Sequence, residues 1–151
     1  MRIKHLIISM AFISCVMLVI SCAGGKKSMT IERGQVPPEF PGYTGVLLVK
    51  SGSNPWERHV NRYSASEYKG PLEIVAPRLF STAPYDDLKK YRFVMELETH
   101  YTQSSGTHGG SIIMTDRQTG KTYRTKSGSG YFKTLKNYLN VLGAYRTQSA
   151  R

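Results

Sequence analysis

The sequence predicts one small α+β domain: a mixed, mainly antiparallel sheet of four or five strands with two or three helices, the C-terminal helix packed on the sheet. Short apolar, β-branched runs bounded by glycine or proline indicate the strands. A proline-started amphipathic segment follows the first run, and leucines and tyrosines recur at helical spacing near the C-terminus. The length available suits one hydrophobic core rather than two.

The first strand and the helix after it are expected between residues 44 and 67. Residues 44–50 hold an aliphatic, β-branched run between glycines, which is typical of a buried strand. Asn54 can cap a helix that starts at Pro55, with Glu57 closing a capping box. We expect this helix to reach residue 63 or 67. Its apolar face would carry Trp56, Val60 and Tyr63.

The next two strands are expected at residues 71–76 and 91–101. The strand, helix, strand order favours a right-handed crossover with the first two strands parallel, and Pro77 ends the second. Residues 84–90 can form a helical turn capped by Asp86 or Asp87. In 91–101 the side chains alternate between two faces, which predicts one buried face and one wetter face. The first face holds Phe93, Met95, Leu97 and Thr99, and the second holds Arg92, Val94, Glu96, Glu98 and His100.

A hairpin and a helix complete the predicted domain. Residues 103–110 are polar and contain glycine, so we expect a loop. Residues 111–115 and 121–125 flank a turn that opens with an aspartate and ends with a glycine, which predicts a hairpin. The final helix is expected to end near Gly143 in a C-terminal cap. Its packed face is predicted to hold Tyr131, Phe132, Leu135, Tyr138, Leu139, Leu142 and Tyr145, and its wet face Lys133, Lys136, Asn137 and Asn140.

The N-terminus has the build of an export signal. Arg2 and Lys4 precede an apolar run over residues 6–20, which is shorter than the roughly 20 residues of a spanning helix. The segment Val19-Ile20-Ser21-Cys22 that ends it resembles the lipobox of bacterial lipoproteins. The resemblance covers about the first 22 residues. It implies cleavage before Cys22, a diacylglyceryl thioether on the Cys22 sulfur and a fatty acyl group, such as palmitate, on its new amino group.

Cleavage before Cys15 is the competing possibility. It would leave a much shorter apolar core and put the large Phe12 at the aliphatic position, so Cys22 is favoured. With Cys15 removed and Cys22 alkylated, no thiol would remain for a disulfide, a metal site or a nucleophile.

The processed chain would have three parts after the signal of residues 1–21. Residues 22–39 are rich in glycine and proline and predict a flexible tether to the lipid. The folded domain is expected over residues 40–146, followed by a tail at 147–151. The lipid anchor predicts a cell-envelope protein. Ala23 after the cysteine favours the outer membrane, with the domain in the periplasm, over the plasma membrane.

Basic residues concentrate in the C-terminal third. From Arg117 to the end, the chain has eight basic residues and no acidic one. The candidate anion-binding residues are Arg117, Lys121, Arg124, Lys126, Lys133 and Lys136, interleaved with aromatic residues. Export makes nucleic acid an unexpected ligand, so an anionic envelope component (lipid headgroups or acidic glycans) or an acidic protein partner fits better. A merely solvated basic surface is the alternative.

Just before the last helix, residues 127–130 read Ser-Gly-Ser-Gly. Backbone amides there, with Lys126 and Lys133 nearby, can hold a phosphate or carboxylate. A plain loop with Ser129 as the helix cap is favoured over that site.

No catalytic residue, metal site or cofactor other than the Cys22 lipid is predicted. The histidines His59, His100 and His108 lie on separate expected elements without a metal-ligand spacing. The sequence therefore favours a non-enzymatic binding or scaffolding module. The alternative is a small hydrolase or transferase of envelope polymers, with Glu96, Glu98, His100 and Ser129 as its candidate residues.

Overall fold

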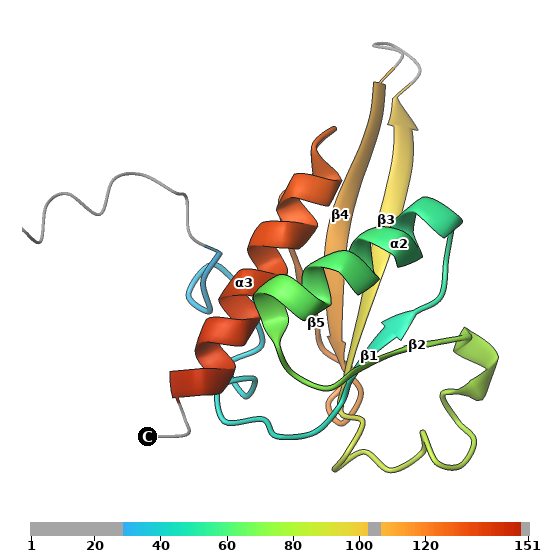
Figure 1. Cartoon of the computed structure of the whole chain (residues 1–151), viewed down its shortest axis with the longest axis vertical. Helices are drawn as coiled ribbons and strands as arrows, with labels where there is room; N and C mark the ends of the chain where they lie inside the picture. Colours follow the sequence, from blue (N-terminus) through green and yellow to red (C-terminus); the bar gives the residue numbers. More distant parts are fainter. Residues whose placement is uncertain (1–28, 103–106, 149–151) are drawn as a thin grey trace, which may run out of the picture.

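The computed structural model describes residues 29–102 and 107–148. They form one α+β domain with a five-stranded mixed sheet in the order β2-β1-β3-β4-β5, as predicted (Figure 1). The elements are β1 (Leu47–Lys50), α2 (Asn54–Tyr63), β2 (Leu72–Val75), β3 (Phe93–Thr102), β4 (Thr107–Asp116), β5 (Thr122–Arg124) and α3 (Tyr131–Gln148). The predicted signal, Cys22 and residues 23–28 lie outside the described residues.

The sheet has a parallel half and an antiparallel half. β1 runs parallel to β2 and to β3, as the crossover argument predicted for the first pair, whereas β3, β4 and β5 are antiparallel neighbours. β4 pairs with β3 along its whole length, but β1 pairs with β3 only at Leu48–Val94 and Val49–Met95. The β3–β4 hairpin therefore extends beyond the end of β1 (Figure 1).

The main core lies between the sheet and the two α-helices. The alternation predicted for β3 is confirmed at Phe93 and Met95, which are fully buried under the helices, whereas Thr99 on the same face is exposed. The helix side of this core includes Trp56, Val60, Leu135, Tyr138, Leu139 and Leu142. A smaller apolar cluster on the opposite face contains Val46, Leu48, Val75, Tyr91 and Val94, with Phe80 and Tyr85 packed against it. The domain thus has two apolar layers, one on each side of the sheet.

The start and end of α2 differ in detail from the prediction. Ser53 rather than Asn54 is the N-cap residue, and Glu57 accepts a hydrogen bond from the backbone N–H of Gly52 at 3.1 Å. Both serine and asparagine suit a cap, so sequence alone did not separate them. The chain continues beyond Tyr63 as one π-helical turn, Ser64–Tyr68.

Two predicted loops and turns are corrected. Residues 84–90 form turns rather than a helical turn, and Asp87 accepts hydrogen bonds from the backbone N–H groups of Lys89 and Lys90 at 2.9 and 3.3 Å. Such a bond lets an aspartate side chain mimic the backbone of a turn. Residues 107–110, predicted as part of a loop, belong to β4. These residues pair with β3, and that pairing holds them in the extended conformation although their glycine-containing composition predicted a loop.

α3 continues past Gly143 to Gln148, so Gly143 does not cap the helix as predicted. A Cβ atom at this position would lie 2.5 Å from the backbone oxygen of Glu67, which means that the glycine allows α3 to approach the π-helical turn. Within residues 29–102 and 107–148, no helix combines the length and the apolar character needed to cross a membrane.

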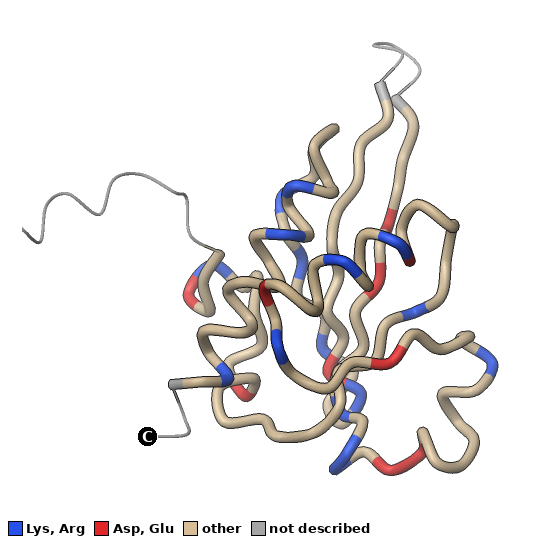
Figure 2. The backbone as a smooth tube through the Cα atoms, viewed as in Figure 1, with Lys and Arg blue, Asp and Glu red and all other residues tan. Residues whose placement is uncertain are grey.

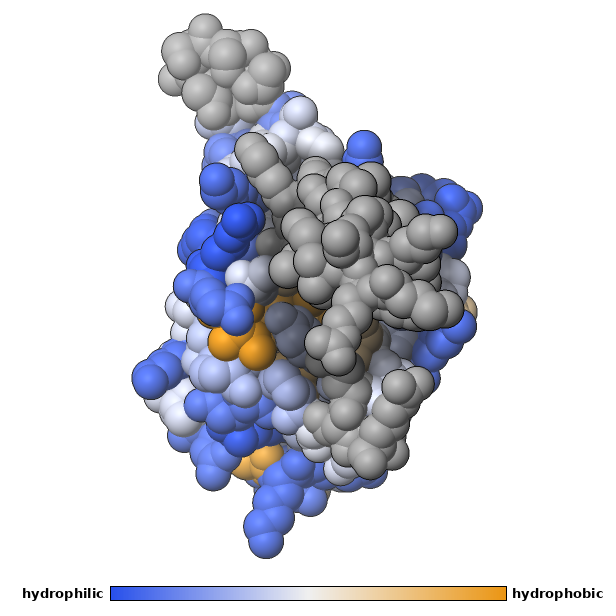
Figure 3. All heavy atoms as spheres, turned by 90° about the vertical axis from the view of Figure 1, so that its left-hand side faces the viewer, coloured by the Kyte–Doolittle hydropathy of each residue, from blue (hydrophilic) through white to orange (hydrophobic). Residues whose placement is uncertain are grey.

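The segment before the predicted domain boundary at Phe40 is packed. Val36 is fully buried, and Met29 and Ile31 contact the main core. The Tyr138 hydroxyl donates a hydrogen bond to the Gln35 backbone oxygen at 2.8 Å. Residues 29–39, which the sequence assigned to the tether, therefore include residues packed against the main core. Figure 3 shows the face on the left of Figure 1, which is mostly hydrophilic with small, separate hydrophobic areas where atoms are coloured.

Candidate functional site

A basic hollow lies between the N-terminal segment and the end of β5. We call it the basic hollow; it has a volume of about 510 Å³ and is lined by Arg33, Gln35, Arg124, Thr125 and Lys126. Two of its residues, Arg124 and Lys126, belong to the predicted anion-binding set. The sequence did not indicate Arg33, because it lies in the segment predicted to be a free tether.

Hydrogen bonds hold both walls of this hollow in place. On one wall, the backbone of Gln35 is tied to α3 by the Tyr138 hydroxyl. On the other, Thr125 donates its N–H to the Ile112 oxygen at 3.0 Å, and its hydroxyl accepts from the Ile112 N–H at 2.9 Å. Thr125 is buried and makes two hydrogen bonds to Ile112 of β4, so the backbone at the flanking Arg124 and Lys126 is held in place.

The basic hollow has an excess of positive charge. Arg124 forms an ion pair with Glu98, with a second contact between Nη2 and Oε1 at 3.2 Å. In the part of the chain that the structure describes, no carboxylate lies within 4.0 Å of the Arg33 or Lys126 side chain nitrogens. Both side chains are exposed. The arrangement can therefore attract an anion from solvent.

Gln35 adds a polar group that lacks a partner. The residue is 8% exposed, and its Oε1 atom is buried without a hydrogen bond among the described residues. A buried polar atom without a partner is destabilising by about 1–3 kcal/mol. Because this oxygen is itself buried, a ligand in the hollow would meet the exposed cations rather than Gln35 Oε1.

The other predicted anion-binding residues lie elsewhere. The Arg117 guanidinium donates to the backbone oxygens of Tyr85, Tyr91 and Phe80 at 2.7, 2.7 and 2.6 Å, and burial lowers its pKa. Lys136 lies 3.5 Å from a Glu67 carboxylate oxygen. Lys121 and Lys133 are exposed. Figure 2 shows basic residues spread over both α-helices and several loops.

Three residues of the predicted enzyme alternative, Glu96, Glu98 and His100, lie on the face of β3 opposite the helices, whereas Ser129 lies in the turn before α3. Each of the two glutamates has a cationic partner: Glu96 pairs with Lys50 at 2.6 Å, and Glu98 pairs with Arg124. His100 Nε2 lies 2.9 Å from the hydroxyl oxygen of Ser127, not of Ser129. The described residues contain no group of three or more histidine, cysteine, aspartate or glutamate side chains placed to hold a metal ion.

The contact between histidine and serine depends on a glycine. Gly109 lies opposite His100 in the β3–β4 pairing, and a Cβ atom on Gly109 would lie 2.6 Å from His100 Nε2. The missing side chain leaves the imidazole room to cross β4 and reach Ser127. This is a histidine–serine hydrogen bond on an exposed surface, without a carboxylate bound to the other imidazole nitrogen in the described part of the chain.

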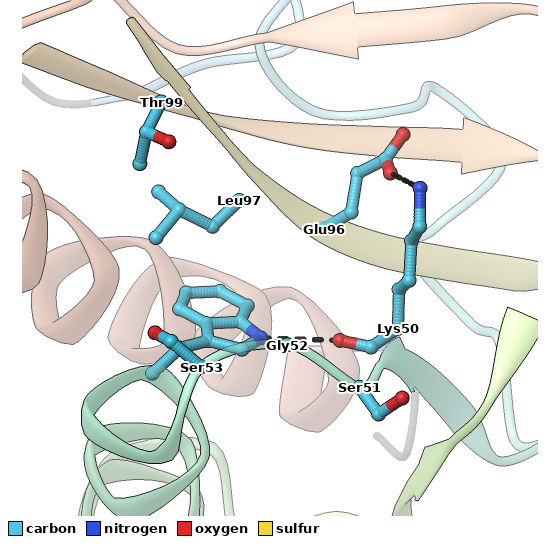
Figure 4. A pocket seen from close by; sticks show the side chains of 8 residues that line it. Lys50, Ser51, Gly52, Ser53, Glu96, Leu97 and Thr99 are labelled. Carbon is cyan, nitrogen blue, oxygen red and sulfur yellow. Dashed lines mark hydrogen bonds and ion pairs between the residues drawn. The ribbon is translucent and has the colours of Figure 1, made fainter. Parts of the chain in front are cut away.

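A second hollow lies where β1 ends, and we call it the β1-end hollow. It has a volume of about 180 Å³ and is lined by Lys50, Ser51, Gly52, Ser53, Trp56, Glu96, Leu97 and Thr99. Figure 4 shows Lys50 and Glu96 meeting on one side of it and Leu97 and Thr99 projecting from β3 on the other. The Trp56 indole donates from Nε1 to the Lys50 backbone oxygen at 3.1 Å. The hollow thus has an apolar floor and a polar rim.

Comparisons with known proteins do not assign a family. No protein-family model matches the chain, and no curated protein gives a significant match. Among solved structures, the chain is similar to TolB from Acinetobacter baumannii, with a TM-score of 0.40 and 9% sequence identity. The similarity covers 73% of this chain but only 29% of that TolB chain.

Proposed function

We propose that this chain is a lipid-anchored lipoprotein of the cell envelope, in the outer membrane, whose domain binds an anionic envelope component without catalysing a reaction. The observation that carries the binding role is the basic hollow. There, Arg33 from the N-terminal segment meets Arg124 and Lys126 from the end of β5. The lipobox resemblance at Cys22 supports the location.

The proposed ligand carries a phosphate or carboxylate group. The guanidinium and ammonium groups would bind the anion. Both glycerophosphate lipid headgroups and acidic glycans have this chemistry. Binding to exposed cations weakens as salt screens the charges, so the complex should dissociate at high ionic strength.

The test titrates the full chain in neutral detergent with polygalacturonate and, separately, with micelles containing phosphatidylglycerol. The variant Arg33→Gln/Lys126→Gln removes two cations from the hollow, and Lys121→Gln/Lys133→Gln removes two exposed cations elsewhere. At about 1 kcal/mol per cation, the first variant should bind roughly 30-fold more weakly. The control should bind nearly as well as the parent chain. Equal losses in both variants would show a non-specific charge effect and reject the hollow as the site.

A hydrolase or transferase of envelope polymers is the second candidate function, and the His100–Ser127 hydrogen bond favours it. A histidine within hydrogen-bonding distance of a serine hydroxyl can act as the base that activates it. The test is covalent labelling of the full chain by a fluorophosphonate probe. Labelling that is lost in Ser127→Ala but retained in Ser129→Ala would support the enzyme and contradict the non-catalytic proposal.

A further inference from the structure

β3 has a free backbone edge beyond the end of β1. The backbone oxygen of Arg92 accepts from Arg117 N–H on the β4 side, and successive residues of a strand point their backbone groups to alternate sides. Leu97, Thr99 and Tyr101 therefore direct their N–H and C=O groups away from β4. Among the described residues, no strand pairs with this side of β3 beyond Met95.

Trp56 helps to end the pairing between β1 and β3. In a continued parallel ladder, the Lys50 backbone oxygen would accept the N–H of Leu97. Instead it accepts the Trp56 indole N–H at 3.1 Å, and the chain turns away after Lys50 towards α2. The edge that starts at Leu97 is thereby left beside the β1-end hollow (Figure 4).

This edge has few of the features that protect edge strands. No proline and no bulge interrupts residues 97–101, and Thr99 is exposed. The side chains of Glu98 and His100 reach across the sheet to Arg124 and Ser127, which lie on the β4 and β5 side. An exposed, regular strand edge is a template for pairing with another strand.

We propose that this edge pairs, antiparallel, with the same edge of a second copy of this chain, with Thr99 of each copy opposite Thr99 of the other. Leu97 of each copy then lies opposite Tyr101 of the other, on the helix side of the sheet. Tyr101 is 57% exposed and its only aromatic neighbour among the described residues is His108. Pairing would cover this exposed ring.

The β1-end hollow fits the ring that this register brings to it. Trp56 and Leu97 provide apolar contacts, and Ser51 and Ser53 provide hydroxyl groups at the rim. A tyrosine has an apolar ring with a hydroxyl at its tip and prefers such a mixed environment. On the other face of the sheet, Glu98 of each copy lies opposite His100 of the other, so the pairing places no like charges opposite each other.

Two neighbouring registers fit less well. A two-fold axis at Glu98 would put the two Glu98 carboxylates opposite each other, which is destabilising. An axis at Leu97 would pair Thr99 with Met95, whose backbone groups on this side already pair with β1. The register centred on Thr99 is compatible with both the charges and the existing ladder.

The first test is disulfide trapping in the full chain. An antiparallel hydrogen-bonded pair has Cα atoms about 5.5 Å apart, which suits a disulfide. Under mild oxidation, Thr99→Cys should give a covalent homodimer well above the background of the parent chain, in which any free thiol comes from unprocessed Cys15 or Cys22. Lys121→Cys, on the exposed β4–β5 turn, is the control. Equal dimer in both variants, or a crosslink of Thr99→Cys to a different protein, would overturn the proposal.

The second test removes one edge donor without touching the β3–β4 ladder. Thr99→Pro lacks the N–H that points to the free edge, and proline is tolerated on edges of this kind. In detergent, light scattering should show roughly tenfold weaker dimerisation for Thr99→Pro than for Thr99→Ala, which keeps the donor, because the symmetric pair loses two hydrogen bonds. A parent chain that is monomeric at all concentrations tested, or equal dimerisation of both variants, would overturn the proposal. Neither test depends on anion binding at the basic hollow.

Discussion

The hydroxyl of Tyr138 on α3 donates a hydrogen bond to the backbone oxygen of Gln35, 2.8 Å away, in the interior of the domain. The two residues are far apart in the sequence, and their bond fixes the N-terminal segment against the C-terminal helix. Tyr138 is fully buried, and burial raises the pKa of its hydroxyl, so it remains a donor throughout the neutral range. One wall of the basic hollow therefore depends on this contact.

Tyr138→Phe should lower both stability and anion binding. The change leaves the Gln35 oxygen without its partner, which we expect to lower the free energy of unfolding by about 1–3 kcal/mol. Urea denaturation measures this loss. Anion binding by the folded variant should also weaken, because Arg33 and Gln35 are no longer held in position. A variant with lower stability but unchanged affinity would show that the segment stays in place without the bond.

Arg117 was expected to bind anions, but its contacts indicate that it holds the loop over residues 77–91. Three backbone oxygens in that loop accept hydrogen bonds from its guanidinium. Arg117→Lys keeps the charge but cannot reproduce this geometry. We expect faster hydrogen exchange across residues 77–91 and about 2 kcal/mol lower stability, since carbonyl groups lose partners. Affinity for anions should not change; a drop as large as that of Arg33→Gln/Lys126→Gln would place Arg117 at the binding site.

Asp116 should set part of the acid sensitivity of the fold. Its carboxylate is fully buried and accepts hydrogen bonds from Arg92 at 3.0 and 2.8 Å, which holds the pKa of Asp116 below its usual range. Its stabilising effect is therefore complete above the unfolded value of about 3.9 and is lost as pH falls from there through the lower folded value.

Asp116→Asn should cost about 3–5 kcal/mol at pH 7, because it leaves a partly buried guanidinium unpaired. The difference from the parent chain should shrink as the pH falls below about 4. Thermal unfolding across this pH range measures both effects, with the exposed Asp86→Asn as control. A difference that stays constant with pH would contradict this role for the carboxylate.

Local patterns were enough to predict most of the fold. The alternation in residues 91–101 gave the correct buried face of β3, and proline and glycine marked the ends of the first strands. The N-terminal segment was missed because its apolar residues, such as Val36, stand singly between polar residues and prolines and show no period. What buries Val36 is the surface of α3 and the sheet, which no local pattern encodes.

Only part of the candidate site could be predicted from the sequence, for the same reason. Arg124 and Lys126 stood out because they are close together in a basic stretch, whereas Arg33 joins them only through the fold. His100 contacts Ser127 rather than Ser129 because of the register of β4 and the absence of a side chain at Gly109. Register between distant strands depends on tertiary packing, so residue spacing could not choose between the two serines.

Gly143→Ala tests why a glycine stands inside α3. Alanine favours a helix over glycine by up to about 1 kcal/mol, so the change would stabilise an isolated helix. Here the new Cβ would lie 2.5 Å from the Glu67 oxygen and 3.0 Å from the Tyr68 oxygen, both on the backbone. We expect a net loss of about 1–3 kcal/mol in urea denaturation. Gly128→Ala, where a Cβ meets nothing within 4 Å, is the control. A stabilised Gly143→Ala variant would mean that α3 does not lie in close contact with the π-helical turn that contains Glu67 and Tyr68.

Cys22→Ala tests the membrane anchor, which lies outside the described residues. If the lipobox resemblance holds, this variant should incorporate no labelled fatty acid and keep the mass of the precursor, whereas Cys15→Ala should be processed and labelled like the parent chain. A single acyl chain binds membranes only marginally, but two or three chains on one residue hold a protein firmly. The parent chain should therefore stay with membranes at high salt, because its anchor does not rely on screened charges. Normal labelling of Cys22→Ala would place the lipid elsewhere and remove the basis for the proposed location.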